Sequence, residues 1–177
     1  MPARARAASV TRRVADPSSR VRRHASLSCR GVIFRLLEQY AGTGIALIFQ
    51  AFLFGSLHVF NEGTSAMTVI SVTLLGAFWT ALYVFSRNLW VVIAHHAAWN
   101  ITIFATGAPL SGQEEWRLSA PLESTYQGPV WLTGGGFGPE DSLINVLVMI
   151  CATAGLAYWA WRKKRFRISP WAAPAKK

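Results

Sequence analysis

Long apolar stretches alternate with short polar links along the middle of the chain. Four of these stretches are 17 to 20 residues long and hold no Lys, Arg, Asp or Glu. A helix needs about 20 mainly apolar residues to cross a bilayer. The pattern therefore predicts an all-α, polytopic membrane helix bundle with about four transmembrane helices, at residues 44–60, 67–85, 89–106 and 142–161.

Composition divides the chain into three parts. Residues 1–29 are rich in Arg, Ala and Ser and hold one acid, Asp16, which predicts a disordered basic arm; a transit peptide or a misplaced start codon are the alternatives. Residues 30–161 form the predicted transmembrane domain. Its extra-membrane segment, 107–141, has the glycine and proline content of turns. Residues 162–177 form a basic tail.

The formal net charge is +10, but the basic residues are not spread over the chain. Of the 18 basic residues, 16 lie in the first 35 or the last 16 positions, and only Arg87 and Arg117 lie between. A nucleic-acid interface has its basic residues interleaved with the fold, so we exclude nucleic acid as a partner. Lys and Arg mark the cytoplasmic side of membrane proteins. We therefore expect a multi-pass protein of the cell membrane with both termini cytoplasmic.

Polar side chains interrupt the third apolar stretch in the sequence AHHAAWN. His96 and Asn100 are four residues apart, so they share one face of a helix, whereas His95 is expected to point elsewhere. His58 lies near the end of the first stretch, one turn after Phe54. If the first and third helices touch, His58, His96 and Asn100 converge in one cavity between them.

Two interpretations of these residues are open. The side chains could join helices through interhelical hydrogen bonds, each worth about 0.6 to 2 kcal/mol. Alternatively they form a functional site, because ionisable groups at membrane depth are costly and usually mark function. Imidazole is also the commonest protein ligand for zinc. The four apolar stretches contain no Glu or Asp that could act as a base.

The segments FGSLH, LWVVIAHHAAWN and LTGGGFGPEDS occur in this order and resemble the CAAX-protease and bacteriocin-processing (CPBP) family of intramembrane metalloproteases. That family includes the type II prenyl-protein endopeptidases. Its Phe-x-x-x-His motif is matched by Phe54 and His58, and its His-x-x-x-Asn motif by His96 and Asn100. The resemblance covers about residues 30–160.

This resemblance implies a metal-dependent endopeptidase that cleaves membrane-associated protein or peptide substrates at the lipid bilayer. By the same resemblance, His58, His96 and Asn100 are the catalytic residues. His58 and His96 hold the divalent metal, which the resemblance implies is zinc.

The family's first motif, Glu-Glu-x-x-x-Arg followed by Gly, is matched only in part. Arg30 and Gly31 fit, but the two glutamate positions are Ala25 and Ser26. The glutamate pair is thought to activate the hydrolytic water, which needs a carboxylate. Glu38 is not expected to replace it, since it lies about two turns past Arg30. We therefore expect an inactive or nearly inactive chain, or a non-catalytic membrane protein that binds a partner through the same cavity.

Overall fold

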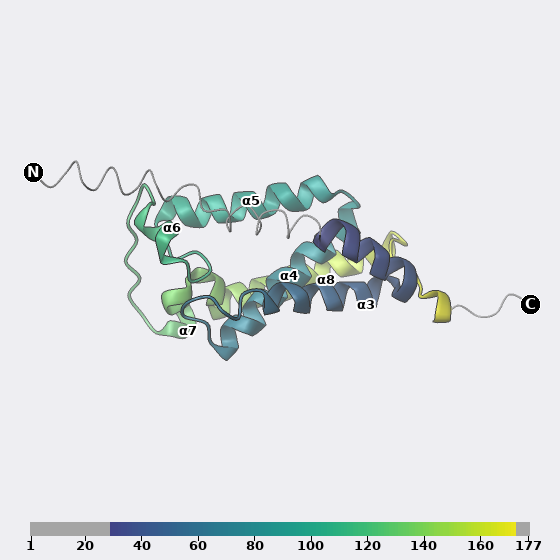
Figure 1. Ribbon diagram of the computed structural model, residues 1–177, viewed down its shortest axis with the longest axis horizontal. Coiled ribbons are helices and arrows are strands. Elements are labelled where there is room, and N and C mark those ends of the chain that lie inside the picture. Colours follow the sequence, from purple (N-terminus) through teal and green to yellow (C-terminus); the bar gives the residue numbers. More distant parts are fainter. Residues whose placement is uncertain (1–28, 173–177) are drawn as a thin grey trace, which may run out of the picture.

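The computed structural model describes residues 29–172, and over this range the chain is an α-helical bundle without β-strands (Figure 1). Its long helices are α3 (Phe34–Ser56), α4 (Ala66–Ser86), α5 (Leu89–Thr106) and α8 (Leu143–Arg162). The short elements are the π-helix η1 (Cys29–Ile33), the helices α6 (Glu114–Leu118) and α7 (Val130–Thr133), and the 3-10 turns η2 (Gly135–Phe137), η3 (Pro139–Asp141) and η4 (Pro170–Ala172).

Within the described residues, four helices are long and apolar enough to cross a membrane, with the first span counted from Gly31. This confirms the predicted fold class. Large apolar side chains are exposed on the outer faces of α3 and α8, including Ile48, Phe52, Leu147 and Val148. Exposed apolar surface of this extent is typical of a membrane protein. The side of the membrane on which the termini lie stays a prediction. The division of the chain into three parts, with boundaries after residues 29 and 161, also stays a prediction.

The first span differs from the predicted one at both ends. It begins well before residue 44, because the charged Arg35 and Glu38 that interrupt the apolar pattern lie inside the helical segment. Glu38 is only 3% exposed and is paired with Arg87 from the end of α4, at 2.7 Å. The helix ends at Ser56, so His58 lies in the following turn and not in the span. The other three predictions agree with the structure to within one residue at each end.

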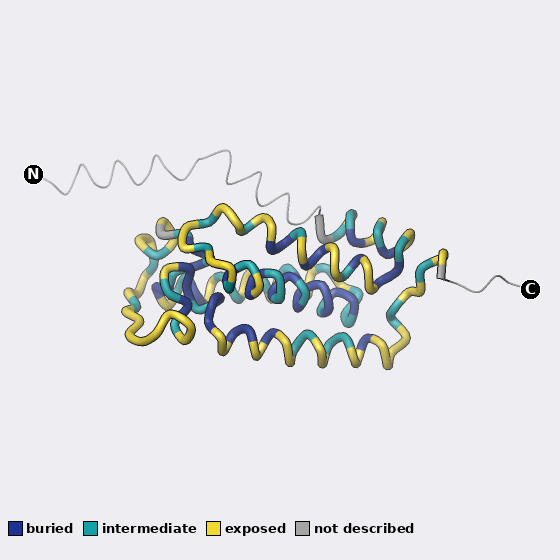
Figure 2. Tube along the Cα trace, turned by 90° about the horizontal axis from the view of Figure 1, so that it is seen from below, coloured by how far each residue is buried: buried dark blue, intermediate teal, exposed yellow. Residues whose placement is uncertain are grey.

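Helix α4 is the centre of the bundle. It packs against α3, α5 and α8, and the buried residues in Figure 2 gather on the inner sides of the helices. Close approach of α3 requires glycine at Gly76, because a Cβ there would lie 2.8 Å from the Cβ of Phe54. Helix α5 lies apart from the layer of α3, α4 and α8 in Figure 1. It packs mainly against α4, and it meets α3 through the rings of His96 and Phe54.

Helix α3 is kinked at Gly42, whose backbone has φ 84° and ψ 166°. This left-handed conformation favours glycine. The segment after α8 turns back to the kink: the backbone N–H of Thr43 donates to the carbonyl of Arg167 at 3.1 Å, and the N–H of Arg167 donates to the Thr43 hydroxyl at 2.8 Å. The C-terminal segment thus supplies partners for the interrupted helix.

Candidate functional site

Phe54 and His58 lie at the end of α3. Phe54 is buried, and its ring centroid lies 4.6 Å from that of the half-buried His58. The Nδ1 atom of His58 is 2.8 Å from the carbonyl oxygen of Phe54. A carbonyl only accepts hydrogen bonds, so Nδ1 of His58 is the donor in this contact. This orientation, fixed by a backbone carbonyl, is typical of histidines that bind metals.

His96 reaches the same phenylalanine from α5. Its ring lies 6.0 Å from the ring of Phe54 in an edge-on arrangement and 4.1 Å from Trp79 of α4, centroid to centroid. Because Phe54 contacts both histidines, the imidazole centroids of His58 and His96 are at most about 10.6 Å apart, the sum of their two distances to Phe54. The two motifs therefore meet at one aromatic cluster, although α3 and α5 do not pack directly along their lengths.

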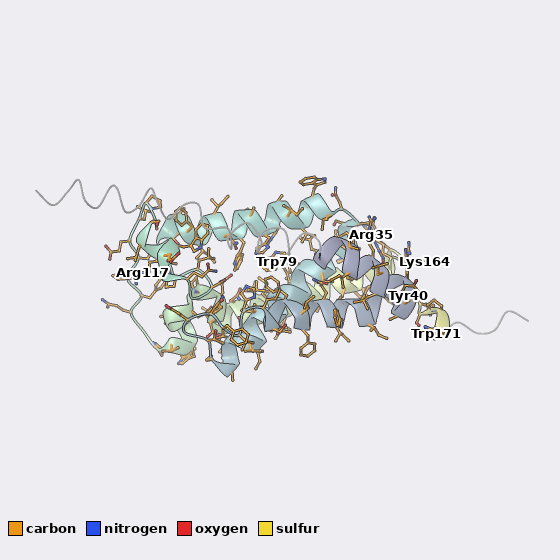
Figure 3. All side chains as sticks on the ribbon, in the orientation of Figure 1. Arg35, Tyr40, Trp79, Arg117, Lys164 and Trp171 are labelled. Carbon is orange, nitrogen blue, oxygen red and sulfur yellow. The ribbon has the colours of Figure 1, made fainter. Side chains whose placement is uncertain are left out.

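Trp79 is the residue of this cluster that the sequence analysis missed. It is 1% exposed and lies between α5 and the layer of α3 and α4 (Figure 3). Its indole N–H donates to Nδ1 of His95 at 3.1 Å, and the ring of His95 lies 5.1 Å from Phe78. His95 was expected to point away from the site, but it shares Trp79 with His96. A tryptophan within an apolar helix carries no signal in sequence that separates it from ordinary core residues.

The remaining predicted residues are placed as follows. Asn100 is half-buried and lies one turn after His96 on α5. Arg30 belongs to the π-helix η1, whose backbone is described, but its side chain is outside the described part. Ala25 and Ser26 also lie outside the described residues, with the predicted arm that contains them.

A buried carboxylate that the sequence analysis did not single out lies beside this region. Glu140 is 2% exposed, and its Oε1 accepts a hydrogen bond from the indole of Trp99 at 2.9 Å. Its Oε2 accepts from the hydroxyl of Ser111, whose carbonyl in turn accepts from the side-chain amide of Asn61 at 2.9 Å. Burial raises the pKa of Glu140 above its ordinary value. Glu140 thus connects α5 with the loops on either side of it.

The next residue, Asp141, is buried against the first turn of α4. Its Oδ2 accepts from the hydroxyl of Thr68 at 2.7 Å and from Ser65 at 3.4 Å. Ser65 and Thr68 also form the capping box that begins α4. Burial raises the pKa of Asp141. Ser142, the next residue, accepts the N–H of Asn145 and so caps the start of α8.

A second buried polar group lies one turn before Phe54. Gln50 is 3% exposed, and within the described part of the chain its Oε1 has no hydrogen-bond partner. It lines a cavity of about 10 Å³ together with Trp79, Thr80 and Tyr83. This volume is about the minimum that holds one water molecule. A water at this place would satisfy Gln50 directly beneath the aromatic cluster.

The described residues supply at most two of the ligands of the zinc site that the resemblance implies. Catalytic zinc usually has three protein ligands, whereas the described residues contain no group of three or more His, Cys, Asp or Glu side chains placed to hold a metal. Glu38 does not supply the missing ligand. Its two oxygens accept from Thr43 at 2.6 Å and from Arg87 at 2.7 Å, and it lies 16 residues before Phe54, about 24 Å along a helix.

The fold and these motifs define a polytopic, α-helical protein with a histidine-containing site between its apolar helices. A family model described as type II CAAX prenyl endopeptidase Rce1-like matches residues 27–102. This confirms the resemblance over both histidine motifs, and it suggests a function of the CAAX-protease type. The match begins just after Ala25 and Ser26. No curated protein and no solved structure matches the chain.

Proposed function

We propose that the chain carries an intramembrane endopeptidase-type site for membrane-associated proteins or peptides, at which His58 and His96 bind a divalent metal, zinc. The observation that carries this proposal is the contact of Phe54 with both histidines. These residues come from two separate motifs within the matched range. Their common neighbour Phe54 keeps the two imidazole rings in one region of the bundle, which a shared site needs.

The proposed roles follow from the chemistry of the side chains. His58, oriented by the carbonyl of Phe54, would be one ligand of the metal. Asn100, one turn after His96, has an amide that can donate a hydrogen bond to a developing oxyanion. A metal at this place would polarise a peptide carbonyl or activate a water molecule.

The second candidate function is binding without hydrolysis. It is favoured by the alanine and serine at positions 25 and 26, where the family motif has its glutamates. General acid–base catalysis is worth about 10²- to 10⁴-fold. We therefore propose that peptide hydrolysis by this chain is slow or absent while its cavity retains affinity for a peptide.

The test uses the purified full-length chain in detergent with a panel of membrane-anchored peptides. Binding of peptide and cleavage are measured separately, with zinc and with a chelator. His96→Ala is compared with His95→Ala, a matched control on the same helix, because only His96 contacts Phe54.

Zinc-dependent cleavage that His96→Ala abolishes and His95→Ala spares would support the peptidase and overturn the proposed inactivity. Peptide binding without cleavage, lost only in His96→Ala, would support the non-catalytic function. If binding and cleavage are unchanged in both His58→Ala and His96→Ala, the site is wrong.

A further inference from the structure

A cleft of about 550 Å³ lies at the end of the bundle opposite the extra-membrane segment. It is lined by side chains from α3, α4 and the segment after α8, namely Arg35, Glu38, Gln39, Tyr83, Arg87, Lys164, Arg165 and Arg167. Figure 3 shows Arg35 and Lys164 together at this end. Neither the histidine site nor the proposed peptidase function uses these residues.

The cations of this cleft are held by the fold. Arg87 is the left-handed C-cap of α4, with φ 54°, and its guanidinium donates to Glu38 and to the carbonyl of Arg165. Arg165 in turn donates to the carbonyl of Phe85. Lys164 also has a left-handed backbone, with φ 54°, which turns the chain back toward Gly42. These contacts fix the basic side chains in the fold, so the cleft is a defined part of the structure.

The charge of the cleft is strongly positive. Among the described residues that line it, five are cationic and only Glu38 is acidic. Glu38 is already engaged by Arg87 and Thr43. The Nε of Arg35 donates to the hydroxyl of Tyr83 at 3.0 Å, which holds the guanidinium at the wall of the cleft. An anion bound there would meet an excess of positive charge.

We infer that this cleft binds the phosphate headgroup of an anionic phospholipid. The cleft lies where the spans end, so it faces the headgroup region of a bilayer. Exposed aromatic residues mark the same end, including Tyr40, Trp159 and Trp161, as expected at a membrane interface. Arginine binds phosphate oxygens through paired hydrogen bonds, and basic pockets between transmembrane helices bind lipid headgroups.

The surroundings favour a lipid over a free anion. Leu36 and Tyr40 follow Arg35 on the same turns of α3 and are 49% and 67% exposed, so acyl chains can lie along them. A cleft of 550 Å³ is also large for a lone phosphate ion, but it accommodates a glycerophosphate headgroup. Lipid binding would stabilise the junction of α3, α4 and the C-terminal segment.

The experiment measures lipid binding by the full chain in a zwitterionic detergent. Short-chain phosphatidylglycerol, phosphatidylcholine and inorganic phosphate are titrated separately, with thermal unfolding and native mass spectrometry as readouts. We expect saturable binding of phosphatidylglycerol alone. The double variant Arg35→Gln/Lys164→Gln should weaken it about 30-fold, because each basic residue near a membrane surface contributes about fivefold.

Lys163→Gln is the matched control for Lys164→Gln. Lys163 is adjacent in sequence, but its ammonium lies over the ring of Phe85, 4.6 Å from the centroid, and it does not line the cleft. The Lys163→Gln variant should bind the lipid with the affinity of the wild type. Circular dichroism checks that each variant is folded, and Arg35→Lys should restore part of the affinity if charge is what matters.

Three results would overturn the inference. Equal binding of phosphatidylcholine would show that the headgroup charge is not recognised. Equal affinity for inorganic phosphate would assign the cleft to a free anion. A loss in Lys163→Gln equal to that in Lys164→Gln would mean diffuse attraction and no defined site. None of these results bears on peptide cleavage, so this inference and the proposed function fail separately.

Discussion

The two ends of the bundle bury carboxylates in opposite ways. At the end of the C-terminal segment, Glu38 is surrounded by cations, with Arg87 at 2.7 Å and Arg167 at 4.0 Å. At the other end, Glu140 and Asp141 are held by neutral donors, which are indole and hydroxyl groups. An ion pair offsets the cost of burying a charge, whereas neutral donors offset less of that cost, so burial still raises the pKa of Glu140 and Asp141.

The difference shows what each end does for the fold. The ion pair joins α3 to α4 and keeps a charge inside a span. The neutral network joins the starts of α4 and α8 to α5, the helix that carries His96. We expect the stability contributed by the first end to change little with pH, and the stability contributed by the second end to depend on pH.

The largest expected effect comes from breaking the ion pair. Glu38→Ala should lower the free energy of unfolding by about 3 kcal/mol, because it leaves the guanidinium of Arg87 without its partner inside the protein. Reversible unfolding in mixed detergent micelles, followed by tryptophan fluorescence, measures this. The exposed neighbour Gln39→Ala should change stability by less than about 0.5 kcal/mol. Equal effects of the two changes would contradict the comparison.

The neutral network should tolerate loss of charge but not loss of the acceptor. Glu140→Ala removes the acceptor of Trp99 and Ser111 and should cost about 2 kcal/mol. Glu140→Gln keeps an acceptor for Trp99 and should cost less than about 1 kcal/mol in the same assay. If Glu140→Gln lowers the free energy of unfolding as much as Glu140→Ala does, the charge of Glu140 is required. Both ends of the bundle would then depend on a charged carboxylate.

The pH dependence of stability should separate the ends further. Burial raises the pKa values of Glu140 and Asp141 in the folded state above their ordinary values of 4.5 and 3.8. At a pH between the unfolded-state and the folded-state pKa of each group, the folded protein therefore binds more protons than the unfolded chain. Stability contributed by these groups therefore rises as pH falls through that window. Unfolding measured from pH 7.5 down to about pH 4 should show this gain in wild type relative to Glu140→Gln/Asp141→Asn. A gain of the same size in the double variant would refute it.

The smallest effect is expected for Arg167, the second cation near Glu38. Its side chain is 62% exposed and lies 4.0 Å from the carboxylate, so solvent screens the pair. Arg167→Ala should lower stability by about 0.5 kcal/mol or less, measured by the same unfolding. A loss approaching that of Glu38→Ala would mean that the side chain of Arg167 carries the junction.

The hydrophobic pattern predicted three of the spans because their residues are uniformly apolar. It failed at the first span, since the pattern alone does not show that Arg87 neutralises Glu38. Motif spacing found His58 and His96, and the structure brings both to Phe54. Trp79 and Glu140 were missed because their roles depend on contacts between segments far apart in sequence. Those contacts are set by helix packing, which local periodicity does not encode.

The kink of α3 at Gly42 has a consequence for the order in which the chain matures. Thr43 leaves the ribosome well before its backbone partner Arg167, which lies 124 residues later in the chain. Chain synthesis proceeds at about 5 to 20 residues per second. The kink therefore stays incompletely bonded for several seconds, and the bundle closes only when the C-terminal segment arrives.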